Sequence, residues 1–242
     1  MIFRPENLTV SLTADGQGCS GLEKEVKKLK EVLYTESLQK GNFRWIAEQK
    51  NEGFKTSGQV QYVAVAGDFR KAGFAYTGAL RILRTILNYD YLWMNLRVKG
   101  GAYGCMATFK RMGESYLVSY RDPHLKDTLQ VYRALPQYLR NFQADEWEMT
   151  KYIIGAISEL DVPLNASAKG ELALAAYFSG VTMKDFQKER DEILKANTAS
   201  IRGLAELIEA VLKENNFCVI GSEAAIEKDR DIFQTVEALI QA

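Results

Sequence analysis

Two apolar segments joined by a short turn constrain the fold of this chain more than any other feature. Residues 102–110 and 114–120 each have the composition of a strand, and the turn at 111–113 ends in glycine, which predicts a β-hairpin. The pair Asp122-Pro123 follows the second strand. It predicts the N-cap and the first residue of a helix that ends near Arg140. A hairpin with a helix directly after it indicates a sheet covered by helices.

The remaining periodic segments alternate between the two kinds of element. Alternating or continuous apolar residues predict three further strands, at 8–13, 59–69 and 217–221. Residues 51–58 between two of the predicted elements are rich in turn formers. Apolar residues at helical spacing, capping residues and closing glycines predict further helices at 21–38, 75–96, 145–160, 165–180 and 198–215, with one more starting at Thr182 and a last one after the final strand.

This order of elements predicts an α+β fold, in which a mostly antiparallel sheet has helices layered on one face. The chain has only four prolines, and no linker rich in Pro, Gly or Ser interrupts it. We therefore expect a single domain over residues 1–242, with residues 1–20 as the segment that enters it.

Charge excludes two classes of partner. Lys and Arg number 31, Asp and Glu also number 31, and the formal net charge is zero. Binding to duplex nucleic acid or to an anionic membrane surface would need a basic patch, and none is visible in the sequence. No window approaches the roughly 18 apolar residues of a membrane-spanning helix. We expect no nucleic acid and no membrane among its partners, and a cytoplasmic location.

The supply of metal ligands is equally restrictive. The chain has one histidine, His124, and three cysteines, Cys19, Cys105 and Cys218, which lie far apart in sequence. Zinc sites in proteins draw on about three or four ligands, two of them usually close together on one element. The sequence therefore predicts no metal site in this chain. The cysteines fit buried free thiols of a reducing compartment better than a disulfide framework.

The sequence contains two candidate catalytic or cofactor motifs, and neither is favoured. Residues 16–21 match the dinucleotide pattern G-x-G-x-x-G, but the next predicted strand is too distant and Asp15 would put a carboxylate beside the pyrophosphate. A plain strand-to-helix connection fits better. His124 is the only imidazole that could activate a Ser or Cys nucleophile. Its place at a helix start favours a surface residue instead.

The segment RVKGGAYG, residues 97–104, combines a tight turn with two hydrogen-bond donors. Gly100 and Gly101 let the backbone turn between a helix end and a strand. Arg97 and Tyr103 on either side of that turn offer a guanidinium fork and a phenol, which suit a peptide carbonyl or a developing oxyanion. A structural turn with a core tyrosine and a surface arginine explains the same residues, and the residues alone favour that simpler explanation.

The same segment resembles the Arg/Tyr motif in the C-terminal half of pitrilysin/insulinase-family zinc metallopeptidases, in particular their presequence-protease branch. Other segments resemble that branch in the same order along nearly the whole chain: NEGF (51–54), QVQYVA (59–64), SYRDPHL (119–125), IIGAISELD (153–161), and Pro163 followed by Lys169-Gly170. One short match would be weak, but an ordered set is fairly specific.

The resemblance implies a fold, and it implies that zinc binding and substrate binding are carried out by different parts of the enzyme. The fold would be that of the mitochondrial-processing-peptidase/LuxS-like metallohydrolases, and this chain would be the last of four domains in a clam-shell peptidase. The zinc motif His-x-x-Glu-His lies in the N-terminal half of such enzymes, so zinc would be bound outside this chain. Arg97 and Tyr103 would bind the substrate backbone and the transition state, with Gly100 and Gly101 in the same substrate-binding segment.

The resemblance also implies the partners and leaves one alternative open. The partners would be the N-terminal half of the same polypeptide and peptide substrates. The full-length protein would be an endopeptidase that degrades peptides in a closed chamber, and the isolated chain would be inactive. The alternative is a non-catalytic structural or partner-subunit domain of the same fold.

Overall fold

The computed structural model describes residues 3–15, 18, 21–36 and 51–239. Contacts divide the chain into two compact units. The smaller unit comprises Met1–Ala47 and Val162–Phe186, and the larger one comprises Glu48–Asp161 and Gln187–Ala242. The prediction of one domain over 1–242, the last of a larger protein, stays a prediction.

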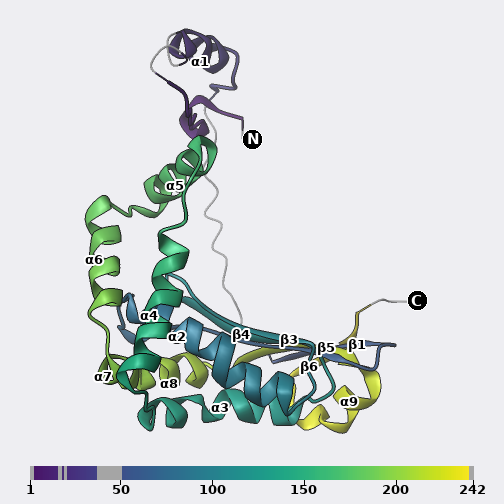
Figure 1. The fold of residues 1–242 in the computed structure, drawn as a ribbon. Coiled ribbons are helices and arrows are strands. Elements are labelled where there is room, and N and C mark those ends of the chain that lie inside the picture. Colours follow the sequence, from purple (N-terminus) through teal and green to yellow (C-terminus); the bar gives the residue numbers. More distant parts are fainter. Residues whose placement is uncertain (1–2, 16–17, 19–20, 37–50, 240–242) are drawn as a thin grey trace. The chain divides into compact units, whose positions relative to one another are not determined.

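The larger unit contains one mixed sheet of six strands (Figure 1). Their bounds are β1 Glu52–Thr56, β2 Gln61–Asp68, β3 Gly104–Phe109, β4 Glu114–Asp122, β5 Asn216–Ser222 and β6 Thr235–Ala238, in the order β3-β4-β2-β5-β1-β6. Strand β4 is antiparallel to β3 and β2, and β2 is antiparallel to β5. Strand β1 is parallel to both β5 and β6. The predicted α+β class and the hairpin are confirmed.

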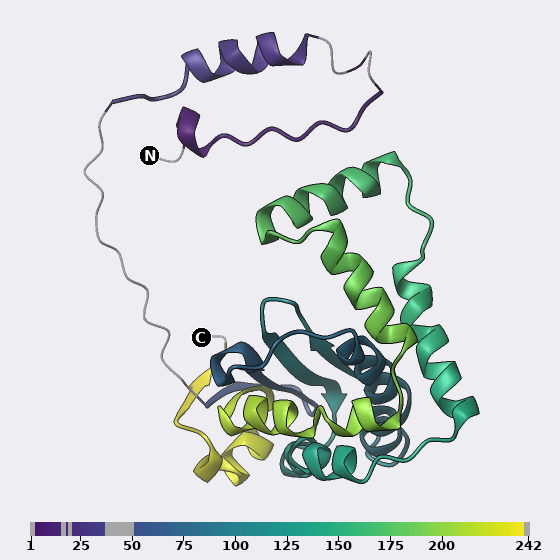
Figure 2. The same ribbon diagram turned by 90° about the vertical axis from the view of Figure 1, so that its left-hand side faces the viewer.

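Helices cover one face of this sheet, as predicted. The helices of the larger unit are α2 Ala79–Ile86, α3 Lys126–Arg140, α4 Glu146–Leu160, α7 Thr198–Arg202, α8 Ala205–Lys213 and α9 Glu223–Lys228, and α6 Met183–Leu194 crosses its boundary. Helices α3 and α8 lie on the same side of the strands in both ribbon views (Figures 1 and 2). The core between these layers is apolar and closed to solvent, with Val63, Leu83, Tyr132 and Val219 all fully buried.

The chain is helical from the start of α2 to Val98, and the helix widens toward its end. After α2 it continues as two π-helical segments, η3 Leu87–Tyr91 and η4 Trp93–Val98. The predicted helix over 75–96 therefore begins four residues later than expected and ends two residues later, in wide turns. Such wide turns are uncommon and are often found at functional sites.

The smaller unit holds η1 Pro5–Asn7, α1 Leu22–Glu31 and α5 Ala166–Ser179. The side chain of Asn165 accepts a hydrogen bond from Ala168 N and caps α5, and Gly180 ends it in the left-handed conformation, as its sequence predicts. The predicted strand at 8–13 is wrong, because residues 8–13 form no strand. Val10 and Leu12 are each 45% exposed, and alternation alone cannot make a strand that lacks a hydrogen-bonded partner.

Several boundaries differ from the prediction. Strands β1 and β6 were not predicted, α1 ends at Glu31, and the helix expected over 198–215 is divided into α7 and α8. Helix α3 begins at Lys126 rather than at Pro123. Of the pattern at residues 16–21, only Gly18 and Gly21 are among the described residues, and Cys19 lies outside them. No helix in the described part of the chain is long and apolar enough to cross a membrane.

Candidate functional site

The turn that links η4 to β3 requires both of its glycines. A Cβ atom on Gly100 would lie 2.6 Å from the carbonyl oxygen of Leu96, which no ordinary contact allows, and Gly101 has a φ of +77°. The backbone N–H of Gly101 donates to the Arg97 carbonyl at 3.0 Å, and that of Ala102 donates to the Leu96 carbonyl at 2.9 Å. The turn is therefore closed by its own backbone and holds Arg97 and Tyr103 near each other.

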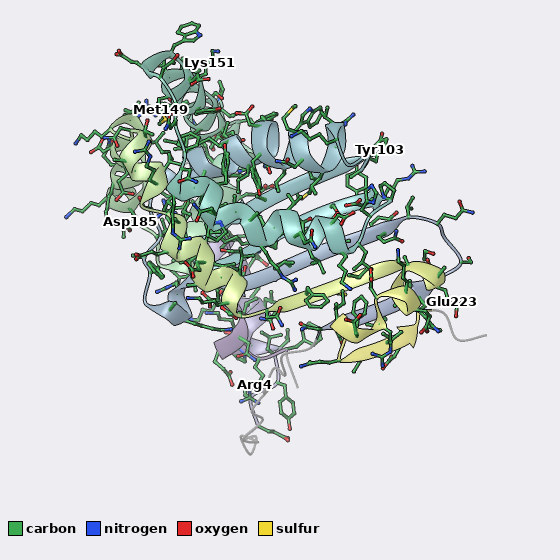
Figure 3. All side chains as sticks on the ribbon, turned by 90° about the horizontal axis from the view of Figure 1, so that it is seen from below. Arg4, Tyr103, Met149, Lys151, Asp185 and Glu223 are labelled. Carbon is green, nitrogen blue, oxygen red and sulfur yellow. The ribbon has the colours of Figure 1, made fainter. Side chains whose placement is uncertain are left out.

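Tyr103 is an exposed residue and not the core tyrosine of the simpler explanation. Its side chain is 58% exposed and lies at the rim of the larger unit (Figure 3). Its backbone N–H donates to the Arg121 carbonyl at 3.3 Å, and its ring meets the edge of Tyr120 with centroids 5.3 Å apart. Gly104 pairs with Tyr120 across the two strands, and the Tyr120 ring lies directly over it. A Cβ atom on Gly104 would clash with this ring.

The planar guanidinium of Arg97 is held by stacking on an aromatic ring. Its guanidinium carbon lies 4.1 Å from the centroid of the Trp93 ring and 5.9 Å from that of Tyr103. Stacking of this kind orients a guanidinium and leaves its N–H donors at the edge available. Among the described residues, none forms a hydrogen bond or ion pair with the Arg97 side chain or with the Tyr103 hydroxyl.

A third residue at this site, Arg121, was not singled out from the sequence. Its guanidinium carbon lies 5.6 Å from the Tyr103 ring centroid. The segment SYRDPHL contains this residue, but no local sequence pattern shows that its side chain points toward Tyr103. Trp93 was also missed, because a tryptophan in the predicted helix could equally have packed its side chain into the core.

The site contains donors but no nucleophile or base. Burial raises the pKa of the nearby Cys105 thiol to about 11, although the charge of Arg97 opposes this. The thiol therefore stays protonated near neutral pH and is a poor nucleophile. His124 is exposed, as expected, and its Nδ1 lies 3.7 Å from a carboxylate oxygen of Asp127. The arrangement suits the binding of carbonyl or carboxylate oxygens and does not by itself suit bond cleavage.

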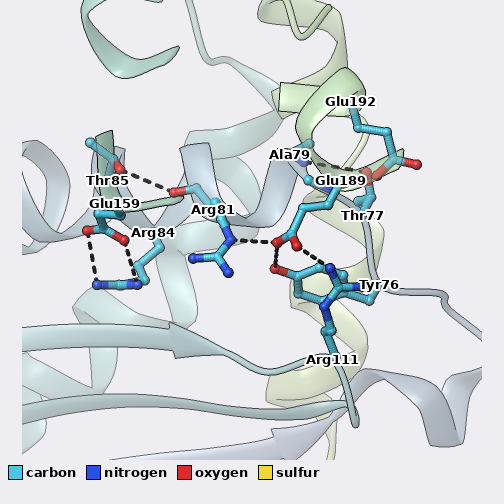
Figure 4. A network of polar contacts seen from close by, with 11 residues as sticks. Tyr76, Thr77, Ala79, Arg81, Arg84, Thr85, Arg111, Glu159, Glu189 and Glu192 are labelled. Atoms are coloured by element: carbon cyan, nitrogen blue, oxygen red, sulfur yellow. Dashed lines mark hydrogen bonds and ion pairs between the residues drawn. The ribbon is translucent and has the colours of Figure 1, made fainter. Parts of the chain in front are cut away.

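A second charged cluster lies between α6, α2 and the hairpin turn, and it was also missed. Glu189 is 1% exposed. It accepts hydrogen bonds from Tyr76 at 2.6 Å and Arg81 at 2.5 Å, and forms an ion pair with Arg111 (Figure 4). Burial raises the pKa of Glu189, but hydrogen bonds from Tyr76 and Arg81 and the charges of both arginines lower it below the ordinary value. These contacts join α6 to α2 and to the hairpin turn.

Comparison with known sequences identifies relatives of this chain. The sequence model of the PreP C-terminal domain matches residues 51–223. Protein HypA of Clostridium perfringens (strain 13 / Type A) is 41% identical over 241 residues, which cover 100% of this chain and 25% of that protein. Presequence protease 1, chloroplastic/mitochondrial, of Arabidopsis thaliana is 31% identical over 237 residues, which cover 95% of this chain and 22% of that protein.

A solved structure supports the fold. The peptidase M16 inactive domain from Pseudomonas fluorescens superposes with a TM-score of 0.57 at 16% identity, over 92% of this chain and 52% of that chain. The likeness at this identity concerns the fold alone. The chain spans about a quarter of the length of the two curated relatives.

Proposed function

Because this chain belongs to the PreP C-terminal domain family, we propose that it is the last domain of a zinc-dependent endopeptidase. In that enzyme Arg97 and Tyr103 bind the backbone of a peptide substrate and stabilise the transition state. Gly100 and Gly101 act in the same substrate-binding segment by shaping the turn between them. The enzyme degrades peptides in a chamber that closes around them.

One observation carries this proposal. A single closed turn positions a stacked guanidinium and an exposed phenol so that the Arg97 carbon lies 5.9 Å from the Tyr103 ring, and the described residues supply no acceptor for either. A guanidinium can donate to a substrate carbonyl, and a phenol can donate to an oxyanion as negative charge develops on it. Donors held in place beforehand lower a barrier more than donors that must first be ordered.

Zinc fits the proposed enzyme but does not fit this chain. Among the described residues, no group of three or more His, Cys, Asp or Glu side chains could hold a metal ion. We therefore assign zinc binding to the N-terminal half of the same polypeptide. The contribution of this chain is to bind and orient the substrate.

The proposal is tested in the full-length enzyme with the variants Arg97→Ala and Tyr103→Phe. We expect each to lower the turnover of a fluorogenic peptide by roughly ten- to a thousandfold, the range for losing a donor to an oxyanion. The control is His124→Ala, which removes an exposed side chain that has no role in the proposed site. It should leave turnover within about threefold of the wild-type value, because its loss removes no donor of the site.

The alternative is a non-catalytic structural or partner-subunit domain of the same fold. It is consistent with the word "inactive" in the description of the Pseudomonas fluorescens structure. In that case peptide cleavage would be unchanged in both Arg97→Ala and Tyr103→Phe, because the domain would contribute only packing. Unchanged cleavage in both variants would therefore refute the proposed function.

A further inference from the structure

Strand β4 contains a bulge next to Tyr103. Gln61 of β2 pairs with Asp122, and Val63 pairs with Ser119. Tyr62 alone therefore faces two residues of β4, Tyr120 and Arg121. Such bulges turn a side chain away from the direction that strict alternation would give it, and they are frequent beside active sites.

The bulge decides where Arg121 points. Ser119 is 0% exposed and Asp122 is 1% exposed, although they are three residues apart and a regular strand would place them on opposite faces. The extra residue returns Asp122 to the buried side and leaves Arg121 exposed at the surface. There its guanidinium carbon lies 5.6 Å from the Tyr103 ring centroid.

This placement has a conformational cost. Arg121 has a φ of 49°, in the left-handed region that is strained for a residue with a Cβ. Asp122 anchors the corner, because its carboxylate accepts hydrogen bonds from His124 N at 2.9 Å and from the Thr128 hydroxyl at 2.7 Å. Strain of this kind persists where the surrounding structure imposes it, and it is concentrated at binding and catalytic sites.

Two arginine side chains lie beside Tyr103 without an ion-pair partner in the described part of the chain. Arg97 and Arg121 both lie within 6 Å of the same ring, and no described carboxylate forms an ion pair with either. The carboxylate next in sequence, that of Asp122, is buried and already bonded. Two guanidinium groups near one exposed phenol are suited to bind an anion with planar oxygens, because each fork can donate two parallel hydrogen bonds.

We propose that Arg121 and Arg97 form a carboxylate-binding site around Tyr103, and that this site holds a carboxylate group of the peptide substrate. The inference rests on the proposed function and adds the chemical class of the group that is bound. A peptide carries a carboxylate at its C-terminus and on Asp and Glu side chains. Both present the same planar pair of oxygens.

The test uses the full-length enzyme and four versions of one quenched fluorescent peptide. The C-terminus is either a free acid or an amide, and one residue beside the cleavage site is either Glu or Gln. The key variant is Arg121→Asn, because asparagine tolerates a positive φ and should keep the bulge while removing the charge. Arg121→Lys retains the charge and loses the fork. Arg133→Gln, which removes an exposed arginine of α3, is the control.

We expect the wild-type enzyme to bind one acidic version at least about tenfold more tightly than its amide partner, a difference of about 1.4 kcal/mol. Arg121→Asn should lose this preference through a higher KM for the acidic peptide. Arg121→Lys should retain part of it, and Arg133→Gln all of it. The version that shows the preference identifies which carboxylate is bound.

Binding is also measured by fluorescence anisotropy with a chelator present, so that the affinity is read without cleavage. Equal affinities for acidic and amide peptides in the wild type would overturn the inference, and so would a preference that survives Arg121→Asn. If Arg121→Asn fails to fold, the comparison of wild type with Arg121→Lys gives the answer. A loss of turnover in Arg97→Ala and Tyr103→Phe without any acid preference would leave the proposed function standing and refute this inference alone.

Discussion

Arg97 and Tyr103 have one property in common: the apolar part of each side chain is held and the polar end is exposed. Arg97 stacks on Trp93, with its guanidinium carbon 4.1 Å from the ring centroid, and Tyr103 packs against Tyr120. Ordering an arginine normally costs up to about 2 kcal/mol of side-chain entropy. Much of that cost is met on folding, so less of it opposes the binding of substrate.

Glu189 shows the opposite arrangement, in which both carboxylate oxygens are buried and have partners within the chain. We expect Glu189→Gln to lower the free energy of unfolding at pH 7 by about 3 kcal/mol, because it breaks a buried ion pair and removes the negative charge that faces Arg81 and Arg111. The measurement is urea unfolding of the chain followed by circular dichroism. The control is Glu159→Gln, whose partner Arg84 is a surface residue, and which should cost less than about 1 kcal/mol.

The pH dependence of the free energy of unfolding, compared between the wild type and Glu189→Gln, gives a second readout. The pKa of Glu189 is lowered in the folded state, so its carboxylate contributes stability that is fully present above the pKa of the unfolded chain, about 4.3 for glutamate. That contribution is lost as the pH falls through the lower folded pKa. The wild type should therefore lose more stability between pH 6 and pH 3 than Glu189→Gln does. Parallel curves for the two proteins would contradict this role.

Residues differ in how well sequence predicts their place. Arg97 and Tyr103 were found because the turn that joins them is local and Gly100 and Gly101 mark it. Arg121 could not be found in the same way, because its direction follows from a bulge that exists only when β4 pairs with β2. Glu189 was missed for a similar reason, since its partners come from segments about 80 to 110 residues away.

At the level of elements, the turn at Gly100 links a π-helical segment to the hairpin, and this makes Gly100→Ala informative. The added Cβ would lie 2.6 Å from the Leu96 carbonyl, so the turn must shift and Tyr103 must move with it. We expect a loss of about 1–3 kcal/mol in stability and at least a tenfold loss of turnover in the full-length enzyme. Thermal unfolding and peptide cleavage measure the two effects.

Gly203→Ala is the matched control for that substitution. Gly203 has a φ of −61°, and the nearest atoms to an added Cβ are 3.4 and 3.5 Å away. The change should be neutral or slightly stabilising, because alanine fits this conformation and restricts the unfolded chain. If Gly100→Ala behaved like Gly203→Ala, the turn would not be the device that holds Arg97 and Tyr103 in position.

Elements with local signals were predicted and elements defined by distant contacts were not. The hairpin, β2, β5 and the cap of α4 at Asp145 all have a local pattern, and the capping box of Asp145 and Glu148 is present. Strand β1 was taken for a turn because Gly53 weakens its pattern. A Cβ at that position would lie 3.1 to 3.2 Å from Ile226 and Phe233, so these side chains would have to shift to make room for it.

For the molecule as a whole, a net charge of zero and a single histidine give no sign of a charged or metal-binding site. The resemblance to the presequence-protease branch is confirmed by the match to the PreP C-terminal domain over residues 51–223. The overall neutrality of the chain conceals a local concentration of positive charge, because Arg97 and Arg121 lie at one corner. Composition averages over the surface and cannot predict such a corner.

The last prediction concerns what this chain does without the rest of the polypeptide. We expect the isolated chain to bind less than one tenth of an equivalent of zinc, because about three or four suitably placed ligands are needed and the described residues supply no such group. We also expect it to cleave no fluorogenic peptide. Metal analysis after dialysis and a peptide assay with added zinc measure the two quantities.

Co-expression with the N-terminal half then separates the two functions that remain. If the chain is part of a composite active site, zinc-dependent cleavage should return in the complex and should fall about tenfold or more when Arg97→Ala is introduced. If the chain only supports the other half, cleavage should return equally with the wild type and with Arg97→Ala. Stoichiometric zinc in the isolated chain would contradict the assignment of zinc to the N-terminal half, because the described residues of this chain supply no group of ligands for it.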